Sequence, residues 1–309
     1  MLSYVVRRVL GFLPVLFIIV SASFFLMRLA PGGPFDQERA LPEQVRLNIE
    51  ARYHLDEPLW RQYARYLGHV ARGDLGPSFR YPDRSVTELL ALGLPASLTL
   101  GACALLVAVG IGGTAGILAA LRRNSLVDYL TMSLALGGIS VPNFVLGPML
   151  MLVFALGLGW LPVAGWGTWR HLILPAITLG AFYAAYVARL TRAGMLEVVG
   201  QEFIRTARSK GLREAAVVLR HALPNAILPV VTYLGPASAA ILTGSVVVET
   251  IFSIPGVGRY FVGSALNRDY TMVLGTVVLY SGILVAFNLI VDVLCAYLDP
   301  RIQLPGRPG

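Results

Sequence analysis

The chain has 309 residues, of which 56% are apolar and 14% are charged, and its formal net charge is +8. A soluble domain of this length usually carries about a quarter charged residues, so the composition disfavours a soluble enzyme and excludes a disordered chain. Nucleic-acid binding needs a hydrated basic face, so basic residues in so apolar a chain indicate membrane topology instead. We therefore expect contact with membrane lipid and no nucleic-acid partner.

Six charge-free runs are each long enough to cross a bilayer as a helix, which takes about 20 apolar residues. They span residues 9–27, 89–121, 129–169, 171–188, 221–248 and 270–291. The third run could hold two spans, but residues 157–169 are rich in Gly, Pro and Trp and predict an outer loop. The sequence therefore predicts an all-α polytopic membrane protein with six transmembrane helices.

The distribution of basic residues predicts the orientation of these helices. With six spans and cytoplasmic N and C termini, thirteen basic residues lie inside and four lie on short outer segments. A seventh span would place the Arg-rich segment 191–220 outside. The first run could instead be a cleaved signal peptide, but it continues through residues 24–27 and is too long for a typical h-region.

The long polar segment after the first span predicts a small helical external lobe. Residues 42–52 and 57–67 both show helical patterns, and Trp60, Tyr63 and Leu67 recur at three- and four-residue steps. The lobe could be a cap on the membrane surface or a docking surface for an outside partner.

Helix-breaking residues within the spans predict bends and close contacts. Pro142 should kink the third span, either as a packing kink or, with Asn143, as a bend lining a pathway. Gly112 and Gly116 form a Gly-x-x-x-Gly pair in the second span, which predicts close helix packing.

Few polar residues within the spans are candidates for function. Asn288 and Asp292 lie near the inner end of the sixth span, where Asp292 is close enough to pair with an inner-loop Arg, and Glu249 ends the fifth span. The mid-span stretches hold no acid, which argues against the alternative of a proton-coupled secondary transporter. A membrane-embedded hydrolase is also disfavoured, since paired acids, a Gly-x-Ser-x-Gly motif and a His/Glu metal cluster are all lacking.

The chain contains a single lysine, Lys210, between Ser209 and Gly211. A Walker A loop needs Gly-Lys-Ser/Thr so that its lysine reaches the β- and γ-phosphates, so this chain has no P-loop of its own. Cys103 and Cys295 lie apart in apolar stretches without zinc-ligand spacing. We therefore expect no catalytic residue and no metal site.

The inner segment of about residues 191–227 carries the clearest pattern. A helix is expected over about 202–210, ended by Gly211, and a second short helix from about 213 to a break at Pro224. Two short basic helices joined at a glycine can dock into a groove on a soluble partner, although anionic lipid could also hold such a loop.

This segment resembles the EAA motif of type I ABC importer permeases, which runs Glu-Ala-Ala, three residues, Gly, nine residues, Ile-x-Leu-Pro. Four residues match it in register: Ala207, Gly211, Leu223 and Pro224. Three depart from it in the way usual for the peptide-transporting branch: Arg205, Thr206 and His221. Further segments resemble that branch: residues 24–33, 53–58, 73–76, 249–256, 267–270 and 298–302. Within it, residues 30–54 are most similar to the B-type permeases of oligopeptide importers.

The resemblance implies a division into residues 1–93 (first helix and external lobe), 94–297 (transmembrane domain with the coupling loop) and 298–309 (cytoplasmic tail). It implies the following residues for coupling to an ATPase: Glu202, Arg205, Thr206, Ala207, Arg208, Lys210, Gly211, Leu212, His221, Leu223 and Pro224. Because Ala207 and Gly211 are four apart and small, we expect both to lie where the loop approaches its partner most closely. Pathway or gating candidates are Pro142, Asn143, Glu249, Asn288 and Asp292.

The resemblance also implies a multisubunit importer in the bacterial cytoplasmic membrane. Its other parts would be a homologous C-type permease, two ATP-binding subunits of the D and F types, and an extracytoplasmic peptide-binding protein. ATP and Mg would be bound by the ATPase subunits, and no cofactor by this chain. The expected substrate is an oligopeptide, with dipeptide, murein peptide, glutathione or a nickel complex as close alternatives.

Overall fold

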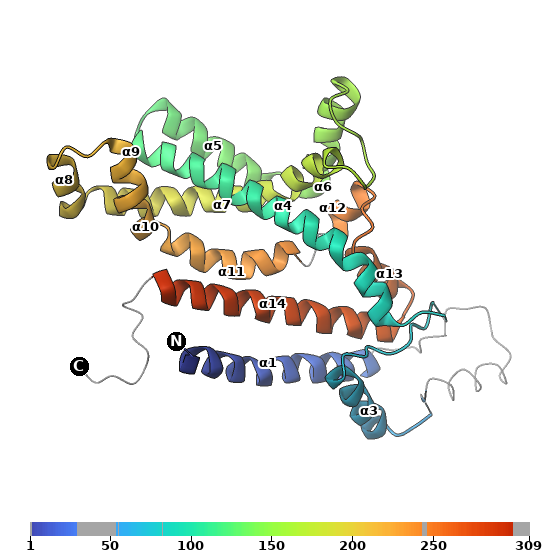
Figure 1. The fold of residues 1–309 in the computed structure, drawn as a ribbon. Coiled ribbons are helices and arrows are strands. Elements are labelled where there is room, and N and C mark those ends of the chain that lie inside the picture. Colours follow the sequence, from blue (N-terminus) through green and yellow to red (C-terminus); the bar gives the residue numbers. More distant parts are fainter. Residues whose placement is uncertain (1, 30–53, 55, 82, 243–245, 299–309) are drawn as a thin grey trace.

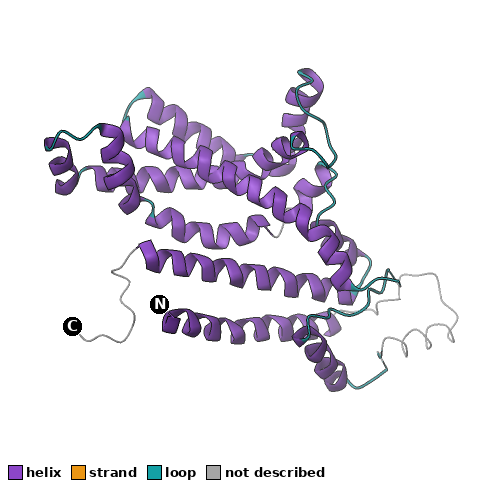
Figure 2. Cartoon of the chain, in the orientation of Figure 1, coloured by secondary structure: helices purple, strands orange, loops and turns teal. Residues whose placement is uncertain are grey.

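The structure is a computed structural model that describes residues 2–29, 54, 56–81, 83–242 and 246–298. All regular elements in this described part are helices (Figure 2). Five are long and apolar enough to cross a membrane, and a bent helix pair makes a sixth crossing if it is counted as one span. The prediction of an all-helical membrane protein is confirmed.

Within the described residues, the helices follow one another closely along the chain (Figure 1). In order they are α1 (Leu2–Leu29), α3 (Leu59–Ala71), α4 (Val86–Leu121), α5 (Leu126–Ser140), α6 (Asn143–Leu150), the π-helix η1 (Met151–Gly157), α7 (Arg170–Val199), α8 (Glu202–Ser209), α9 (Glu214–Ala216), the π-helix η2 (Val217–Ala222), α10 (Leu223–Ala226), α11 (Leu228–Leu242), α12 (Val246–Ile251), α13 (Gly258–Leu266) and α14 (Tyr270–Leu298).

Helices α4 and α7 form the closest pair, and glycines set their separation. A Cβ atom at Gly116 would lie 2.5 Å from the carbonyl oxygen of Ala188, and one at Gly112 would overlap the carbonyl of Ala184. Because only glycine leaves room for the backbone of α7, the two helices pack backbone to backbone. The close packing predicted from the Gly-x-x-x-Gly pair is confirmed.

The third predicted span is broken, where the sequence predicted a kink. Helices α5 and α6 meet at an angle of 110°. Proline restricts the residue before it to extended backbone, and Val141 accordingly adopts φ −90° and ψ 115°, so α5 ends at Ser140 and Pro142 precedes the first turn of α6. Residues 158–169 contain no helix, as the predicted loop requires.

The helix of the external lobe among the described residues is α3, which packs on the end of α1. The hydroxyl groups of Tyr63 and Ser21 are 2.6 Å apart, and the rings of Tyr66 and Phe24 stack with centroids 5.3 Å apart. Trp60 is exposed and does not share this contact face. The helix predicted over residues 42–52 lies outside the described residues.

The long helices run between two ends of the molecule. Helix α1 begins, and α14 finishes, at the end that carries α8, α9 and α10, while α13 and α3 lie at the opposite end (Figure 1). Six crossings, with the α5–α6 pair as one, return the chain to the end at which it began. The start of α1 and the end of α14 therefore lie on the same side of the molecule as the α8–α10 loop.

Candidate functional site

The loop α8–η2–α10 is a folded unit attached to the end of α7. Helix α8 buries Ile204 and Ala207, which are three apart and so lie on one face. They join a buried apolar cluster with the end of α7 and with η2: Ala120, Met195, Val198, Val217, Val218, Ala222 and Ala226. The loop therefore has a small hydrophobic core of its own, which a basic loop held only by lipid would not need.

Ala207 occupies a different place from the one predicted. We expected it to face a partner together with Gly211, but its side chain is buried inside the chain, against this cluster. Its small size allows α8 to approach η2, whereas Gly211 is exposed in the turn after α8. Gly211 has φ +78°, a conformation that favours glycine. The backbone angle is therefore the reason why this position needs a glycine.

An ion pair closes the turn around Gly211. The Arg208 guanidinium donates from Nε to Glu214 Oε2 at 3.1 Å and from Nη2 to Oε1 at 2.6 Å. This bidentate contact lowers the pKa of the Glu214 carboxyl and raises that of Arg208. Arg208, expected to reach an ATPase acid or lipid phosphate, is thus engaged within its own loop.

The second helix of the loop extends past Pro224, where the sequence predicted a break. The helical path runs through the π-turns of η2 and continues to Ala226, and the break falls at Ile227. Pro224 lies in the first turn of α10, directly after the π-turns of η2, where it removes one backbone donor from the helical path without ending it. Asn225 Nδ2 donates to the carbonyl of His221 at 2.9 Å and supports the same turn.

The loop is fixed to α7 at both of its ends. Ile204 lies in one buried cluster with the α7 residues Met195 and Val198. At the other end, Gly194 of α7 lies so close to Ala226 that a Cβ atom would overlap the Ala226 carbonyl. A displacement of the loop must therefore displace α7 as well.

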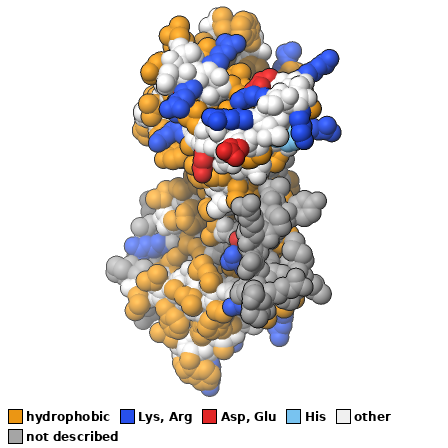
Figure 3. Space-filling view, turned by 90° about the vertical axis from the view of Figure 1, so that its left-hand side faces the viewer, with side chains coloured by type: hydrophobic (Ala, Val, Ile, Leu, Met, Phe, Trp, Pro, Cys, Tyr) orange, Lys and Arg blue, Asp and Glu red, His pale blue; other side chains and the backbone are white. Residues whose placement is uncertain are grey.

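The loop exposes both apolar and basic side chains, and we call this set of residues the docking face. It consists of Phe203, Leu212, Leu219, Arg205 and Lys210, all exposed. Among the described residues, no ion pair involves Arg205 or Lys210. Figure 3 looks onto this end of the molecule and shows Lys and Arg side chains gathered on it. Large apolar side chains exposed beside basic ones are typical of a protein-binding surface.

The remaining predicted coupling residues take supporting positions. Glu202 and Thr206 are exposed on α8, where Thr206 Oγ1 donates to the Glu202 carbonyl at 3.0 Å. His221 is half-buried, and Leu223 packs against the cluster. The sequence analysis did not select Phe203 and Leu219. The signal that could have indicated them is a large apolar residue on the otherwise polar face of a short basic helix.

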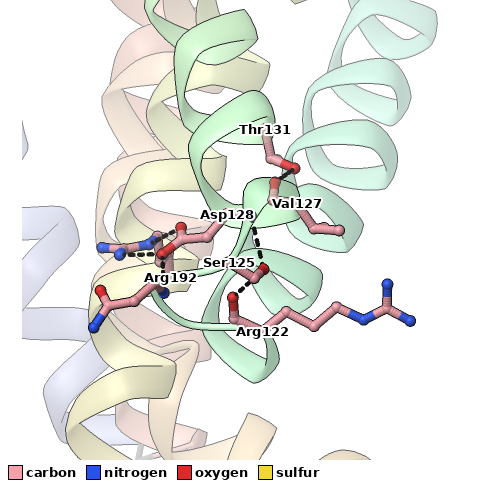
Figure 4. A network of polar contacts seen from close by, with 7 residues as sticks. Arg122, Ser125, Val127, Asp128, Thr131 and Arg192 are labelled. Carbon is pink, nitrogen blue, oxygen red and sulfur yellow. Dashed lines mark hydrogen bonds and ion pairs between the residues drawn. The ribbon is translucent and has the colours of Figure 1, made fainter.

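A buried carboxylate beside the loop was also missed. Asp128, at the start of α5, accepts from Arg192 Nε at 2.6 Å and from Nη2 at 2.7 Å, and Figure 4 shows this contact between α5 and α7. Asp128 also accepts from the backbone N–H of Asn124 at 3.0 Å. Asp128 and Arg192 are far apart in the sequence, so the sequence alone did not predict this ion pair. The pair joins α5 to the end of α7 that holds the loop.

The predicted pathway residues do not form one site. Pro142 and Asn143 lie at the α5–α6 bend. Asn288 is half-buried on α14 close to Gly235 of α11. Asp292 lies 3.3 Å from Arg8 Nε, so the predicted ion pair exists, but its arginine belongs to α1 and not to an inner loop.

Glu249 is a structural link at the opposite end of the molecule. Its Oε1 accepts from Ser97 Oγ at 2.6 Å and its Oε2 accepts from the Gly258 N–H at 2.9 Å. Ser97 Oγ in turn accepts from the Val257 N–H at 2.9 Å. The buried carboxylate therefore ties α4, α12 and the start of α13 together.

A bundle of membrane-crossing helices with a compact, exposed loop at one end defines a multi-pass membrane protein. The family model of the inner membrane component of binding-protein-dependent transport systems matches residues 112–304, and the model of the N-terminal part of such components matches residues 1–100. The chain belongs to this family of ABC importer permeases, which are transport subunits of the inner membrane. A permease of this kind works with ATPase and membrane components.

Relatives match almost the whole chain. The oligopeptide transport system permease protein OppB of Haemophilus influenzae is 51% identical over 98% of this chain and 100% of its own. OppB of Escherichia coli K12 is 50% identical over the same shares, and the dipeptide transport system permease protein DppB of Bacillus subtilis is 46% identical over 98% and 99%. An inward-facing structure of the MetNI methionine ABC transporter has the same fold, with a TM-score of 0.54 and 17% identity over 68% of this chain and 96% of that one.

Proposed function

We propose that this chain is the B-type permease subunit of an importer that carries oligopeptides across the cytoplasmic membrane. The observation that carries the proposal is the full-length similarity, at 51% identity, to a permease named for oligopeptide transport. Dipeptides are the second candidate, since a permease named for dipeptide transport is 46% identical over nearly the whole chain. Murein peptide, glutathione and nickel complexes are the further alternatives if pentapeptide uptake does not depend on this chain.

The docking face is proposed to bind one of two separate ATP-binding subunits, of the D and F types. Phe203 and Leu212 would enter an apolar cleft on that subunit, while Arg205 and Lys210 would meet acidic groups at its rim. ATP and Mg would be held by those subunits, and this chain would contribute no cofactor and no catalytic group. Because the loop is fixed to α7, closure of the ATPase pair would move α7 and, through the glycine contacts, α4.

A homologous C-type permease would complete the pathway, and an extracytoplasmic peptide-binding protein would deliver the substrate. We place the end of the molecule that carries α8–α10 in the cytoplasm, because basic residues concentrate there. The start of α1 and the end of α14 lie on the same side. The bend at Pro142 and Asn143 is the proposed pathway element, since an interrupted helix exposes backbone groups where a substrate can pass. Asn288, Asp292 and Glu249 would act on gating through helix packing.

The substrate is tested by uptake of labelled dipeptide, tripeptide and pentapeptide in cells with and without this chain, with the partner genes intact. Loss of pentapeptide uptake with dipeptide uptake spared establishes the oligopeptide assignment. Unchanged pentapeptide uptake refutes it and moves the substrate to a dipeptide, murein peptide or metal complex.

The docking face is tested by Phe203→Ser in the assembled importer. Removing a large apolar side chain from the centre of an interface should weaken ATPase binding about tenfold or more and lower peptide-stimulated ATP hydrolysis and uptake together. Leu126→Ser is the matched control, because Leu126 is also exposed at this end but lies on α5, outside the loop. Equal behaviour of the two variants would contradict the assignment.

A further inference from the structure

A large hollow lies at the end of the molecule opposite the docking face. Its volume is about 640 Å³, and it opens between the segment before α4, helix α13 and the start of α14. Three arginines and two tyrosines line it: Arg80, Arg84, Arg259, Tyr81 and Tyr260. We call it the arginine pocket. Its size is within the range of pockets that hold small ligands.

The pocket has an excess of positive charge. Its lining holds one acid, Asp269, and among the described residues no ion pair involves any of the three arginines. Asp269 is buried, and its oxygens are occupied: Oδ1 accepts from the N–H groups of Phe79 and Met272, and Oδ2 accepts from Ser78 Oγ. Its charge is used within the fold and does not neutralise the guanidinium groups.

The same hydrogen bonds hold the pocket wall in place. Asp269 lies just before α14 and binds the segment around Ser78 through hydrogen bonds. The backbone N–H of Arg80 also donates to Asp269 Oδ2, at 3.3 Å. On the facing wall, the Arg259 guanidinium lies 4.9 Å from the Tyr260 ring and donates to its hydroxyl at 3.1 Å. Arginines therefore line two walls of one hollow, where an anionic group that enters can contact guanidinium groups.

Guanidinium groups bind carboxylates through paired, charge-assisted hydrogen bonds. A permease that accepts peptides of many sequences can rely only on features that all peptides share, and the C-terminal carboxylate is the anionic one. We propose that the arginine pocket binds the C-terminal carboxylate of a peptide as it enters the permease, an inference that rests on the proposed peptide-transport function. The tyrosines would contact the adjoining residues without selecting their side chains.

The test uses the complete importer with its binding protein in proteoliposomes. Uptake rates are compared for one pentapeptide with a free C-terminal carboxylate and for the same pentapeptide with a C-terminal amide. Arg84→Gln and Arg259→Gln are compared with the wild type, with Arg84→Lys as the charge-conserving variant. Arg72→Gln is the matched control, because Arg72 is an exposed arginine at the end of α3 outside the pocket.

We expect the acid-to-amide ratio of uptake rates to fall about tenfold in each glutamine variant, as loss of a charge-assisted contact predicts, and to fall less in Arg84→Lys. The ratio in Arg72→Gln should equal that of the wild type. Any preference of the binding protein cancels, because every variant is measured with the same binding protein.

Three results would overturn the inference. The first is an unchanged ratio in the glutamine variants. The second is an equal loss for both peptides that added binding protein restores, which would mean that an acidic surface of that protein occupies the pocket. The third is failure of the glutamine variants to assemble with the partner subunits. A wild-type importer that carries neither peptide would instead refute the proposed peptide-transport function.

Discussion

Gly211 shows how one backbone angle sets the shape of the docking face. Its φ of +78° costs a residue with a side chain about 1–2 kcal/mol, and the Arg208–Glu214 pair closes across this turn. A substitution here should therefore reorient α8 relative to η2.

We predict that Gly211→Trp uncouples ATP hydrolysis from transport, because both the strained turn and the added bulk displace α8 from its partner. Peptide-stimulated ATPase activity and uptake measured together would show uptake falling further than hydrolysis. Gly200→Ala is the control, since Gly200 has φ −80° and no atom lies near a Cβ at that position. Normal hydrolysis and uptake in Gly211→Trp would refute this role.

Asp128 carries the second residue-level prediction. Asp128→Asn leaves the Arg192 guanidinium without its carboxylate and should lower the melting temperature of the importer and weaken coupling. The exchanged pair Asp128→Arg with Arg192→Asp should recover part of the loss, because the charges again oppose each other. Melting curves of the single and double variants measure this, and additive losses in the double variant would contradict a direct ion pair.

At the scale of elements, the α4–α7 pair is the rigid part of the bundle. Gly116→Leu should separate the helices, destabilising the protein by about 1–3 kcal/mol or more, as overpacking does. Gly113→Leu should have little effect, since nothing lies within 4 Å of a Cβ atom at Gly113. Thermal unfolding in detergent compares the two variants, and equal melting temperatures would argue against backbone contact between α4 and α7.

The broken α5–α6 element shows a limit of reading helices from composition. The charge-free run over residues 129–169 predicted one span with a kink, because apolar residues continue through Pro142. A bend of 110° depends on what the second half packs against, and α6 packs against α12, where Gly147 adjoins Phe252. Because these contacts join residues far apart in the sequence, the residues around Pro142 do not by themselves predict the angle of the bend.

At the scale of the whole molecule, the path of the chain predicts which segments share a side of the membrane. In a cysteine-free background, with Cys103 and Cys295 replaced, Lys210→Cys should react with a membrane-impermeant thiol reagent from the cytoplasmic side. Trp160→Cys, in the loop after η1, and Arg72→Cys should react from the opposite side. Labelling of intact cells and of inverted vesicles measures this, and reaction of residues 160 and 210 from one side would exclude six crossings.

The sequence by itself determined the class of molecule, an all-helical fold of membrane-spanning helices, the two-helix loop with its turn at Gly211 and the close packing at Gly112 and Gly116. These follow from local rules, because apolar length, charge distribution and glycine spacing act within one helix or turn. The tertiary structure decided what these elements contact. It turned Ala207 inward, engaged Arg208 with Glu214, joined Asp128 to Arg192 and assembled the arginine pocket from three separate segments. Such contacts depend on the folded path of the chain, which brings distant residues together and is not encoded in any single stretch of sequence.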